Sequence, residues 1–248
     1  MTYAQLVGDA LHTPFEGWDF GVFRGRYTQG SPSWDYRELV RERLRAAGSL
    51  LDLGTGGGEL LASLAPLPPV TAATEAYPPN VGVARRRLAP LGVTVHDTSG
   101  DPARLPLPDA SFDLVLSRHE AYVPAEVHRV LRPGGTFVTQ QVGGRDLEQL
   151  NAALGGPPHA YRDWDLDTAV RGVEQAGLIV LDAHEELVPA ALHDIGAVVL
   201  LLRITPWQIP GFDVDGYGPR LRDLHTRLSA GTPLPVTCHR FLVTARRG

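Results

Sequence analysis

The segment from Leu50 to Glu59 constrains the fold of this chain more than any other. Its apolar start contains one acid, Asp52, and leads into three glycines at G-x-G-x-G spacing: Gly54, Gly56 and Gly58. Glycine tolerates positive φ and has no Cβ, so a buried strand that ends at glycines and continues as a helix brings backbone amides close to a ligand. The sequence therefore predicts a cofactor site at this turn.

The glycine spacing and the basic residues narrow the choice of cofactor. The fingerprint of NAD-binding turns is G-x-G-x-x-G, which this spacing does not match. A P-loop needs a lysine to reach the phosphates, and this chain contains no lysine. The turn therefore disfavours a dinucleotide, and the missing lysine excludes a P-loop.

Five segments, in order, resemble motifs of class I S-adenosylmethionine-dependent methyltransferases of the small-molecule, ubiquinone-methyltransferase-like type. They are 52–58 (DLGTGGG), 74–76 (TEA), 100–106 (GDPARLP), 111–116 (SFDLVL) and 130–137 (VLRPGGTF). The resemblance is clear from Ser49 to Phe137 and looser elsewhere. It implies an enzyme with S-adenosyl-L-methionine as its methyl donor.

Strands and helices alternate from Ser49 onward, which is typical of an α/β fold with a doubly wound parallel sheet. The resemblance implies a Rossmann-like, seven-stranded sheet, with an N-terminal helical cap (1–47) before the methyltransferase domain (48–248). Acceptor-side lid elements are expected within 145–235, and the whole is effectively one domain. The run Ile195–Ile204 fits a helix or a strand by periodicity, and we favour a lid helix.

The resemblance also assigns cofactor-binding residues. Glu75, at the predicted end of a strand, would accept hydrogen bonds from both ribose hydroxyls. Asp101 would receive the adenine amino group, with Asp97 as its rival. The implied set is Asp52, Gly54, Thr55, Gly56, Glu75, Ala76, Asp101, Pro102 and Arg118, in which Ala76 and Pro102 would pack against the adenine.

Asp52 lies within an apolar run, where a carboxylate cannot stay ionised without hydrogen-bond donors or a cation. The resemblance places it near the methionine end of the cofactor, where it would organise the loop and meet the amino group. A purely structural role in the turn remains open.

The segment Ser117–Tyr122 follows the predicted fourth strand and would lie beside the sulfonium methyl. It lacks the Asn/Asp-Pro-Pro-aromatic sequence of adenine-amino and glutamine methyltransferases, which counts against those acceptors. His119 is a candidate general base, because its ordinary pKa of about 6.5 suits proton removal near neutral pH, and Glu120 is a second catalytic candidate. Alternatively, the His119 side chain forms a hydrogen bond with the backbone or pairs with Glu120.

Gln140 and Gln141, polar residues at the end of the next predicted strand, are candidates to face the methyl acceptor.

The amino-acid composition limits the classes of partner that this chain is expected to bind. The net charge of −5 and pI near 6.0 argue against a nucleic-acid footprint. The single cysteine, Cys238, can form no intramolecular disulfide, and the acids and histidines from His184 to Asp194 match no zinc pattern, so no metal is expected. The longest apolar window, Ile195–Leu202, is far below the roughly 20 residues that span a bilayer. We therefore expect a cytoplasmic protein, a monomer or homodimer, with no membrane association.

Taken together, these features predict an enzyme that moves a methyl group from S-adenosyl-L-methionine to an oxygen or nitrogen of a small-molecule acceptor. The alternatives are a peptide or RNA methyltransferase, or an S-adenosylmethionine-binding protein without turnover. A carboxylate acceptor would need no base, because methyl transfer from a sulfonium is an in-line displacement in which positioning and desolvation can supply most of the catalysis.

Overall fold

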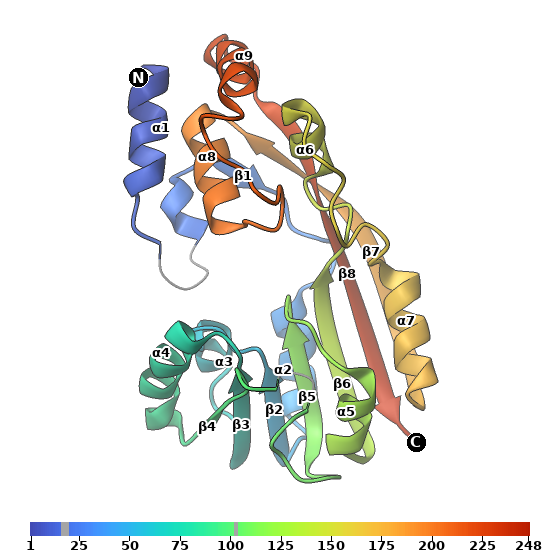
Figure 1. Ribbon diagram of the computed structural model, residues 1–248. Coiled ribbons are helices and arrows are strands. Elements are labelled where there is room, and N and C mark those ends of the chain that lie inside the picture. The colour runs from blue at the N-terminus through green and yellow to red at the C-terminus, as the bar shows by residue number, and fades with distance from the viewer. Residues whose placement is uncertain (16–19, 102–103) are drawn as a thin grey trace. The chain divides into compact units, whose positions relative to one another are not determined.

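A computed structural model describes residues 1–15, 20–101 and 104–248 of the chain. Its described residues form an eight-stranded sheet in the order β1-β7-β8-β6-β5-β2-β3-β4 (Figure 1). The pairings β2–β3, β2–β5, β3–β4 and β5–β6 are parallel, while β1–β7 is antiparallel. The α/β fold is confirmed. The sheet has eight strands rather than the expected seven, because Tyr27–Gln29 (β1) pairs with Ala190–Leu192 at its edge.

The parallel strands lie in the part of the chain, from Ser49 onward, in which strands and helices are expected to alternate. They are β2 (Ser49–Leu53), β3 (Val70–Glu75), β4 (Thr94–Asp97), β5 (Phe112–Arg118) and β6 (Leu131–Val142). All five residues of β2 are buried, as expected for a central strand that is covered on both faces. The remaining long strands are β7 (Leu178–Leu192) and β8 (Leu234–Arg247).

Alternate residues of the central strands supply two separate hydrophobic clusters. Leu50 packs in a cluster with Leu61 and Leu88, whereas Leu51 packs in another with Val127 and Phe137. Successive strand residues point to opposite faces, so helices cover both faces of this part of the sheet. These helices are α2 (Tyr36–Leu44), α3 (Glu59–Ser63), α4 (Pro78–Leu88), α5 (Pro124–Val130) and α7 (Leu166–Gln175), and a short 3-10 turn (η2) covers Ala89–Leu91.

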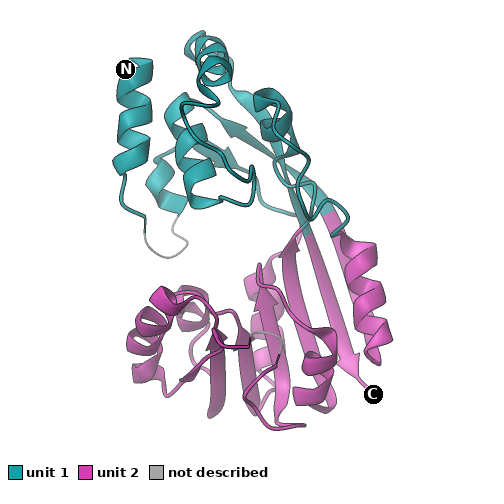
Figure 2. Ribbon diagram, viewed as in Figure 1, with its two compact units in different colours: residues 1–32, 143–164, 186–240 teal, residues 33–142, 165–185, 241–248 magenta. Residues whose placement is uncertain are grey.

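The chain divides into two compact units, coloured separately in Figure 2. Unit 2 holds residues 33–142, 165–185 and 241–248, which include all the parallel strands. Unit 1 holds residues 1–32, 143–164 and 186–240. Its helices are α1 (Tyr3–His12), η1 (Phe20–Phe23), α6 (Glu148–Leu154), α8 (Ile195–Ile204) and α9 (Gly218–Ser229).

Helix α8 forms the centre of unit 1. Nine of its ten residues are buried, all except Arg203, and they pack with α1, α6 and α9 in one hydrophobic cluster. The Asp194 carboxylate caps the helix by accepting a hydrogen bond from the Ala197 N–H at 2.8 Å. The expectation of a helix over Ile195–Ile204 is confirmed.

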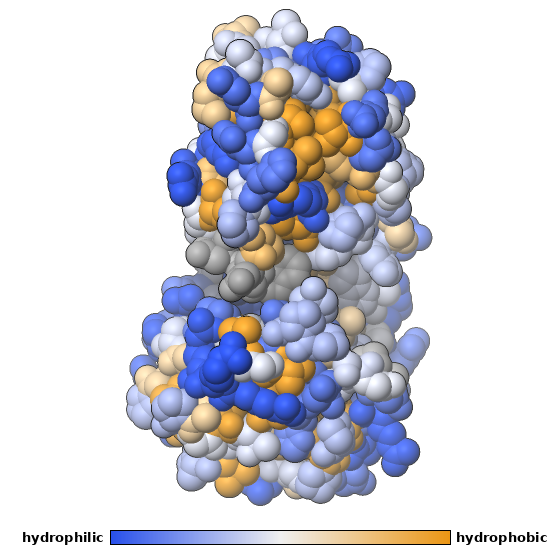
Figure 3. Space-filling view, turned by 60° about the vertical axis from the view of Figure 1, so that its left-hand side comes forward, coloured by the Kyte–Doolittle hydropathy of each residue, from blue (hydrophilic) through white to orange (hydrophobic). Residues whose placement is uncertain are grey.

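The surface shows no long apolar stripe on the face drawn in Figure 3, where hydrophobic residues lie in small groups among hydrophilic ones. Over the described ranges, no helix combines the length and apolar character that crossing a membrane requires. Helix α8, with ten residues, falls well short of the required length.

Candidate functional site

The turn after β2 depends on glycine at three positions. Gly54 and Gly56 both have φ of +62°, and Gly58, which precedes α3, has φ of +82°. Residues with a Cβ rarely adopt this left-handed conformation. The turn is fixed to β3 by two hydrogen bonds, from Gly54 N–H to Thr74 Oγ1 at 3.2 Å and from Thr55 N–H to Thr74 O at 2.9 Å.

Glu75, the last residue of β3, holds the glycine turn from the neighbouring strand. Its Oε2 accepts a hydrogen bond from Gly56 N–H at 2.7 Å, and its Oε1 accepts one from Tyr77 N–H at 2.7 Å. Burial raises the pKa of this carboxyl, while the backbone N–H donors oppose the shift. Each carboxylate oxygen can accept a further hydrogen bond, so Glu75 can bind a ligand without releasing the turn.

A cavity of about 230 Å³ opens at the carboxyl ends of these strands, within unit 2. Its walls combine the glycine turn, the ends of β2 and β3, the segment after β5 and the start of α5. The lining residues are Leu53, Gly54, Thr74, Ala76, Thr98, Leu105, Glu120, Ala121, Tyr122, Val123, Glu126 and Val127. Ligands of doubly wound sheets bind at this edge.

Glu120 brings a carboxyl group into the cavity, directly over the turn. A Cβ added at Gly54 would lie 2.1 Å from Glu120 Cγ, so the two residues are in close contact. Burial and the charge of Glu75 raise the pKa of Glu120 to about 7. The main chain of Glu120 is fixed as well, because its carbonyl accepts hydrogen bonds from Ser117 Oγ and Gln141 Nε2, both at 3.0 Å.

Asp52 is buried in β2, with only 4% of its surface exposed. Burial raises its pKa to about 7, while the nearby Thr55 hydroxyl and Arg118 guanidinium lower it. Burial raises the pKa of the phenol of Tyr36, at the start of α2, and the charge of Asp52 raises it further. Its buried hydroxyl has no hydrogen-bond partner within the described part of the chain.

The acids expected near the adenine lie in different settings. Asp97 pairs with Glu75 in the register of β3 and β4, and its Oδ1 accepts a hydrogen bond from Ser99 N–H at 2.9 Å. Hydrogen bonds from the side chain and the backbone of Ser99 lower the pKa of Asp97. Thr98, which sequence reasoning did not single out, is buried and lines the cavity. Asp101 is exposed and lies outside the described lining, and Pro102 lies outside the described residues. The adenine contacts therefore stay a prediction.

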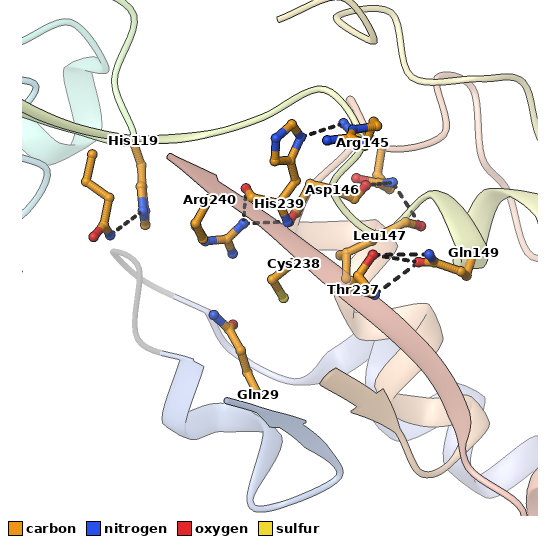
Figure 4. A network of polar contacts seen from close by, with 12 residues as sticks. Gln29, His119, Arg145, Asp146, Leu147, Gln149, Thr237, Cys238, His239 and Arg240 are labelled. Atoms are coloured by element: carbon orange, nitrogen blue, oxygen red, sulfur yellow. Dashed lines mark hydrogen bonds and ion pairs between the residues drawn. The ribbon is translucent and has the colours of Figure 1, made fainter. Parts of the chain in front are cut away.

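His119 follows β5 with φ of +61° and is held by Gln140 of β6. Its backbone N–H donates to Gln140 O at 2.8 Å, and its Nε2 lies 3.1 Å from Gln140 Nε2. Gln140 Oε1 in turn accepts a hydrogen bond from Trp34 Nε1–H at 2.8 Å. Figure 4 shows the His119 ring beside an amide side chain, joined to it by a dashed line. The general-base role of His119 stays a prediction.

Comparison with known proteins decides the family. Residues 51–139 match a family described as a methyltransferase domain. The chain is 28% identical over 181 residues to malonyl-[acyl-carrier protein] O-methyltransferase of Marinomonas sp. (strain MWYL1), covering 64% of this chain and 67% of that protein. It also shares the fold of the YcgJ protein of Bacillus subtilis, with a TM-score of 0.60, 19% identity, and coverage of 85% of this chain and 97% of that one.

Residues 51–139 form a methyltransferase domain of the class I, S-adenosylmethionine-dependent type. A second methyltransferase relative, ubiquinone biosynthesis O-methyltransferase of Methylobacterium nodulans, is 30% identical over 152 residues. That alignment covers 54% of this chain and 61% of the relative, so it spans less than two thirds of that protein's length.

This methyltransferase also carries a buried polar network in unit 1 that sequence reasoning missed (Figure 4). Arg240 pairs with Asp146 at 2.5 Å, and the same carboxylate oxygen accepts a hydrogen bond from His239 N–H at 2.9 Å. Burial raises the pKa of Asp146, and the charge of Arg240 opposes the shift. Cys238 is buried, with its Sγ 3.0 Å from Tyr27 Oη. The network fixes the loop before α6 to strand β8.

No group of three or more potential metal ligands occurs in the parts of the methyltransferase that the structure describes. The residues considered from the sequence form local contacts instead, since His184 Nε2 lies 3.0 Å from Asp182 Oδ2, and Asp194 caps α8.

Proposed function

We propose that this methyltransferase binds S-adenosyl-L-methionine in the cavity of unit 2 and transfers its methyl group to an oxygen or nitrogen of a small-molecule acceptor. The observation that supports the cofactor most directly is the position of Glu75. Its carboxylate is buried at the end of a strand, is fixed by two backbone N–H groups and keeps the capacity to accept the two hydroxyls of a ribose.

The residues around the cavity fit this cofactor. S-adenosyl-L-methionine carries a sulfonium and an ammonium, and when bound it supplies an electrophilic methyl group. The buried carboxyls of Asp52 and Glu120 would meet these positive charges, and Gly54 would let the ligand approach the backbone. The apolar wall that includes Leu105 and Tyr122 would exclude water from the reacting atoms.

Apart from Pro102, which lies outside the described residues, we assign to the cofactor the residues that the sequence predicts. Glu75 would bind the ribose, Asp52 the amino group, and the turn Gly54–Gly56 the methionine portion. Ala76, in the cavity wall, would pack against the adenine, and Asp101 would receive its amino group. Arg118, exposed at the end of β5, would tune the charge of Asp52.

An oxygen acceptor is supported by the two relatives described above, which are both O-methyltransferases by name. Methyl transfer is an in-line displacement that disperses the charge of the sulfonium, so positioning and desolvation can supply much of the catalysis. A carboxylate acceptor would need no base. For a hydroxyl acceptor, Glu120 is a group in the cavity wall that can take up a proton near neutral pH.

The test combines binding with turnover. Calorimetric titrations with S-adenosyl-L-methionine, S-adenosylhomocysteine and NAD should show binding of the two sulfur nucleotides and none of NAD. A mass-spectrometric screen of small carboxylic acids, phenols and amines should then detect a product heavier by one methylene. Binding of NAD alone would refute the cofactor assignment. Tight cofactor binding with no product from any acceptor, peptide or RNA would favour a binding protein without turnover.

A further inference from the structure

Trp34, Gln140 and His119 form a short relay of hydrogen bonds within unit 2. The indole N–H of Trp34 donates to Gln140 Oε1 at 2.8 Å, and Gln140 Nε2 lies 3.1 Å from His119 Nε2. Gln140 is 6% exposed, whereas Trp34 is half-buried and His119 is exposed, so both hydrogen bonds are partly buried. The face of Trp34 is fixed separately by stacking on the His184 ring, with ring centroids 6.0 Å apart.

The chemistry of the three groups gives the relay a direction. An indole N–H can only donate, so the atom of Gln140 that faces Trp34 must be the carbonyl oxygen. The amide nitrogen, which can only donate, therefore faces His119 Nε2. A ring nitrogen that receives a hydrogen bond carries no proton, so in the neutral ring the proton is on Nδ1.

We propose that Trp34 and Gln140 are positioning residues that hold His119 in the Nδ1–H tautomer, so that His119 donates a hydrogen bond rather than removing a proton. Its role in methyl transfer rests on the proposed function, whereas the tautomer follows from the hydrogen bonds alone. A proton on Nε2 would place two donors against each other, at the cost of one hydrogen bond and an unpaired polar group.

The backbone of the same two residues supports this arrangement. His119 N–H donates to Gln140 O at 2.8 Å, next to the paired residues Arg118 and Gln140 at the end of β5 and β6. His119 is thus held by Gln140 through both its main chain and its ring. Such double attachment fixes the ring orientation as well as its tautomer, in the way that an outer hydrogen-bond partner fixes a functional histidine.

His119 and its neighbour Glu120 would then have different roles in methyl transfer. His119 would orient a group with a free lone pair, such as the second oxygen of a carboxylate. Glu120, which lines the cavity, would be the residue able to accept a proton when the acceptor has one to lose. The sequence-based role of His119 as the base would then pass to Glu120.

Nuclear magnetic resonance of protein labelled with ¹⁵N-histidine tests the tautomer directly. Two-bond ¹H–¹⁵N correlation distinguishes Nδ1–H, Nε2–H and doubly protonated rings, and His119→Gln identifies the His119 signals among those of the nine histidines. Near neutral pH we expect the Nδ1–H pattern in the wild-type protein. An Nε2–H pattern or a doubly protonated ring would overturn the proposal.

Two variants test the positioning residues. Gln140→Glu keeps an acceptor for Trp34 but presents an oxygen to Nε2, so the proton should move to Nε2. Trp34→Phe removes the indole donor and lets the amide turn over, so a mixture of tautomers is expected. Gln175→Glu, which adds the same charge at an exposed position of α7, should leave the His119 signals unchanged. Unchanged signals in both Gln140→Glu and Trp34→Phe would contradict the proposal.

The spectra need neither cofactor nor acceptor, so they give the same answer if the proposed function fails. Where turnover is measurable, the effects of two variants on kcat, on cofactor affinity and on the pH–rate profile give a second readout. His119→Gln should lower kcat and leave cofactor affinity unchanged. With a hydroxyl acceptor, Glu120→Gln should remove the limb of the pH–rate profile that reports protonation of the base. If this limb of the pH–rate profile disappears in His119→Gln and remains in Glu120→Gln, His119 is the base and the proposed separation of roles is wrong.

Discussion

Gly54 and Glu120 touch so closely that a Cβ on the glycine would lie 2.1 Å from Glu120 Cγ. The turn after β2 and the segment after β5 are adjacent because β2 and β5 pair in parallel, with Leu53 opposite Ser117. This contact joins the two segments that would meet the methionine portion and the reacting methyl. A side chain at position 54 would therefore displace Glu120.

Gly54→Ala should abolish cofactor binding, because the new Cβ would displace Glu120 and strain a residue with positive φ. Gly92→Ala is the matched control. Gly92 has φ of +73°, yet no described atom lies within 4 Å of a Cβ built on it. Both variants should lose about 1–2 kcal/mol of unfolding free energy from the left-handed backbone. Calorimetry should show normal cofactor affinity for Gly92→Ala alone, and equal affinity in both variants would refute the steric account.

Glu75→Gln should weaken S-adenosyl-L-methionine and S-adenosylhomocysteine alike, since both contain the ribose. The amide would place an NH₂ group against one of two backbone donors, Gly56 N–H or Tyr77 N–H. The loss should be about 1.5–3 kcal/mol, the range for a hydrogen bond to a charged group. Titration calorimetry measures it, with the exposed Glu174→Gln as a control. A loss confined to S-adenosyl-L-methionine would point to the sulfonium rather than the ribose.

Asp52 makes stability depend on pH. Its folded-state pKa of about 7 lies above the ordinary value of 3.8, so between these values the folded protein binds more protons than the unfolded chain. The contribution of Asp52 to the free energy of unfolding therefore falls as pH rises from about 4 to about 7 and is constant above that range. Asp52→Asn should raise the Tm relative to wild type at pH 8 and much less at pH 5. Parallel Tm profiles for the two proteins would rule out the raised pKa.

Glu120 should make the cofactor preference depend on pH. Its pKa of about 7 means that the carboxyl becomes negative as pH rises through neutrality, which favours the sulfonium of S-adenosyl-L-methionine over the neutral sulfur of S-adenosylhomocysteine. The affinity ratio of the two should rise about 10-fold from pH 6 to pH 8, within the range for a charged hydrogen bond. Glu120→Gln should make this ratio independent of pH. A ratio that still rises in the variant would assign the effect to another group, such as Asp52.

Local patterns in the sequence predicted the central sheet well. Strand β3 ends at Glu75 as predicted, because an apolar, β-branched run there ends at an acid before two prolines. The position of Glu75 beside the glycine turn followed from the same pattern, since adjacent parallel strands end at one edge. Strand β1 was not predicted, because a strand of three residues shows too little periodicity to be distinguished from a loop.

Pairings between distant residues could not be predicted in this way. Gln140 drew attention as a polar residue at the end of a strand, but its partners depend on the register of β5 and β6 and on the placement of Trp34, 106 residues away. The pair formed by Asp146 and Arg240 spans 94 residues. Helical and strand periods report which face is buried and carry no information about which polar groups meet across the fold.

The position of the cavity lining along the chain has a consequence for synthesis. All its residues lie between Leu53 and Val127, so they are synthesised before any residue of α6, α8 or α9. Arg240, the partner of Asp146, is synthesised after all of these elements. Every residue of the wall of the ligand site is therefore synthesised before the ion pair in unit 1 can form.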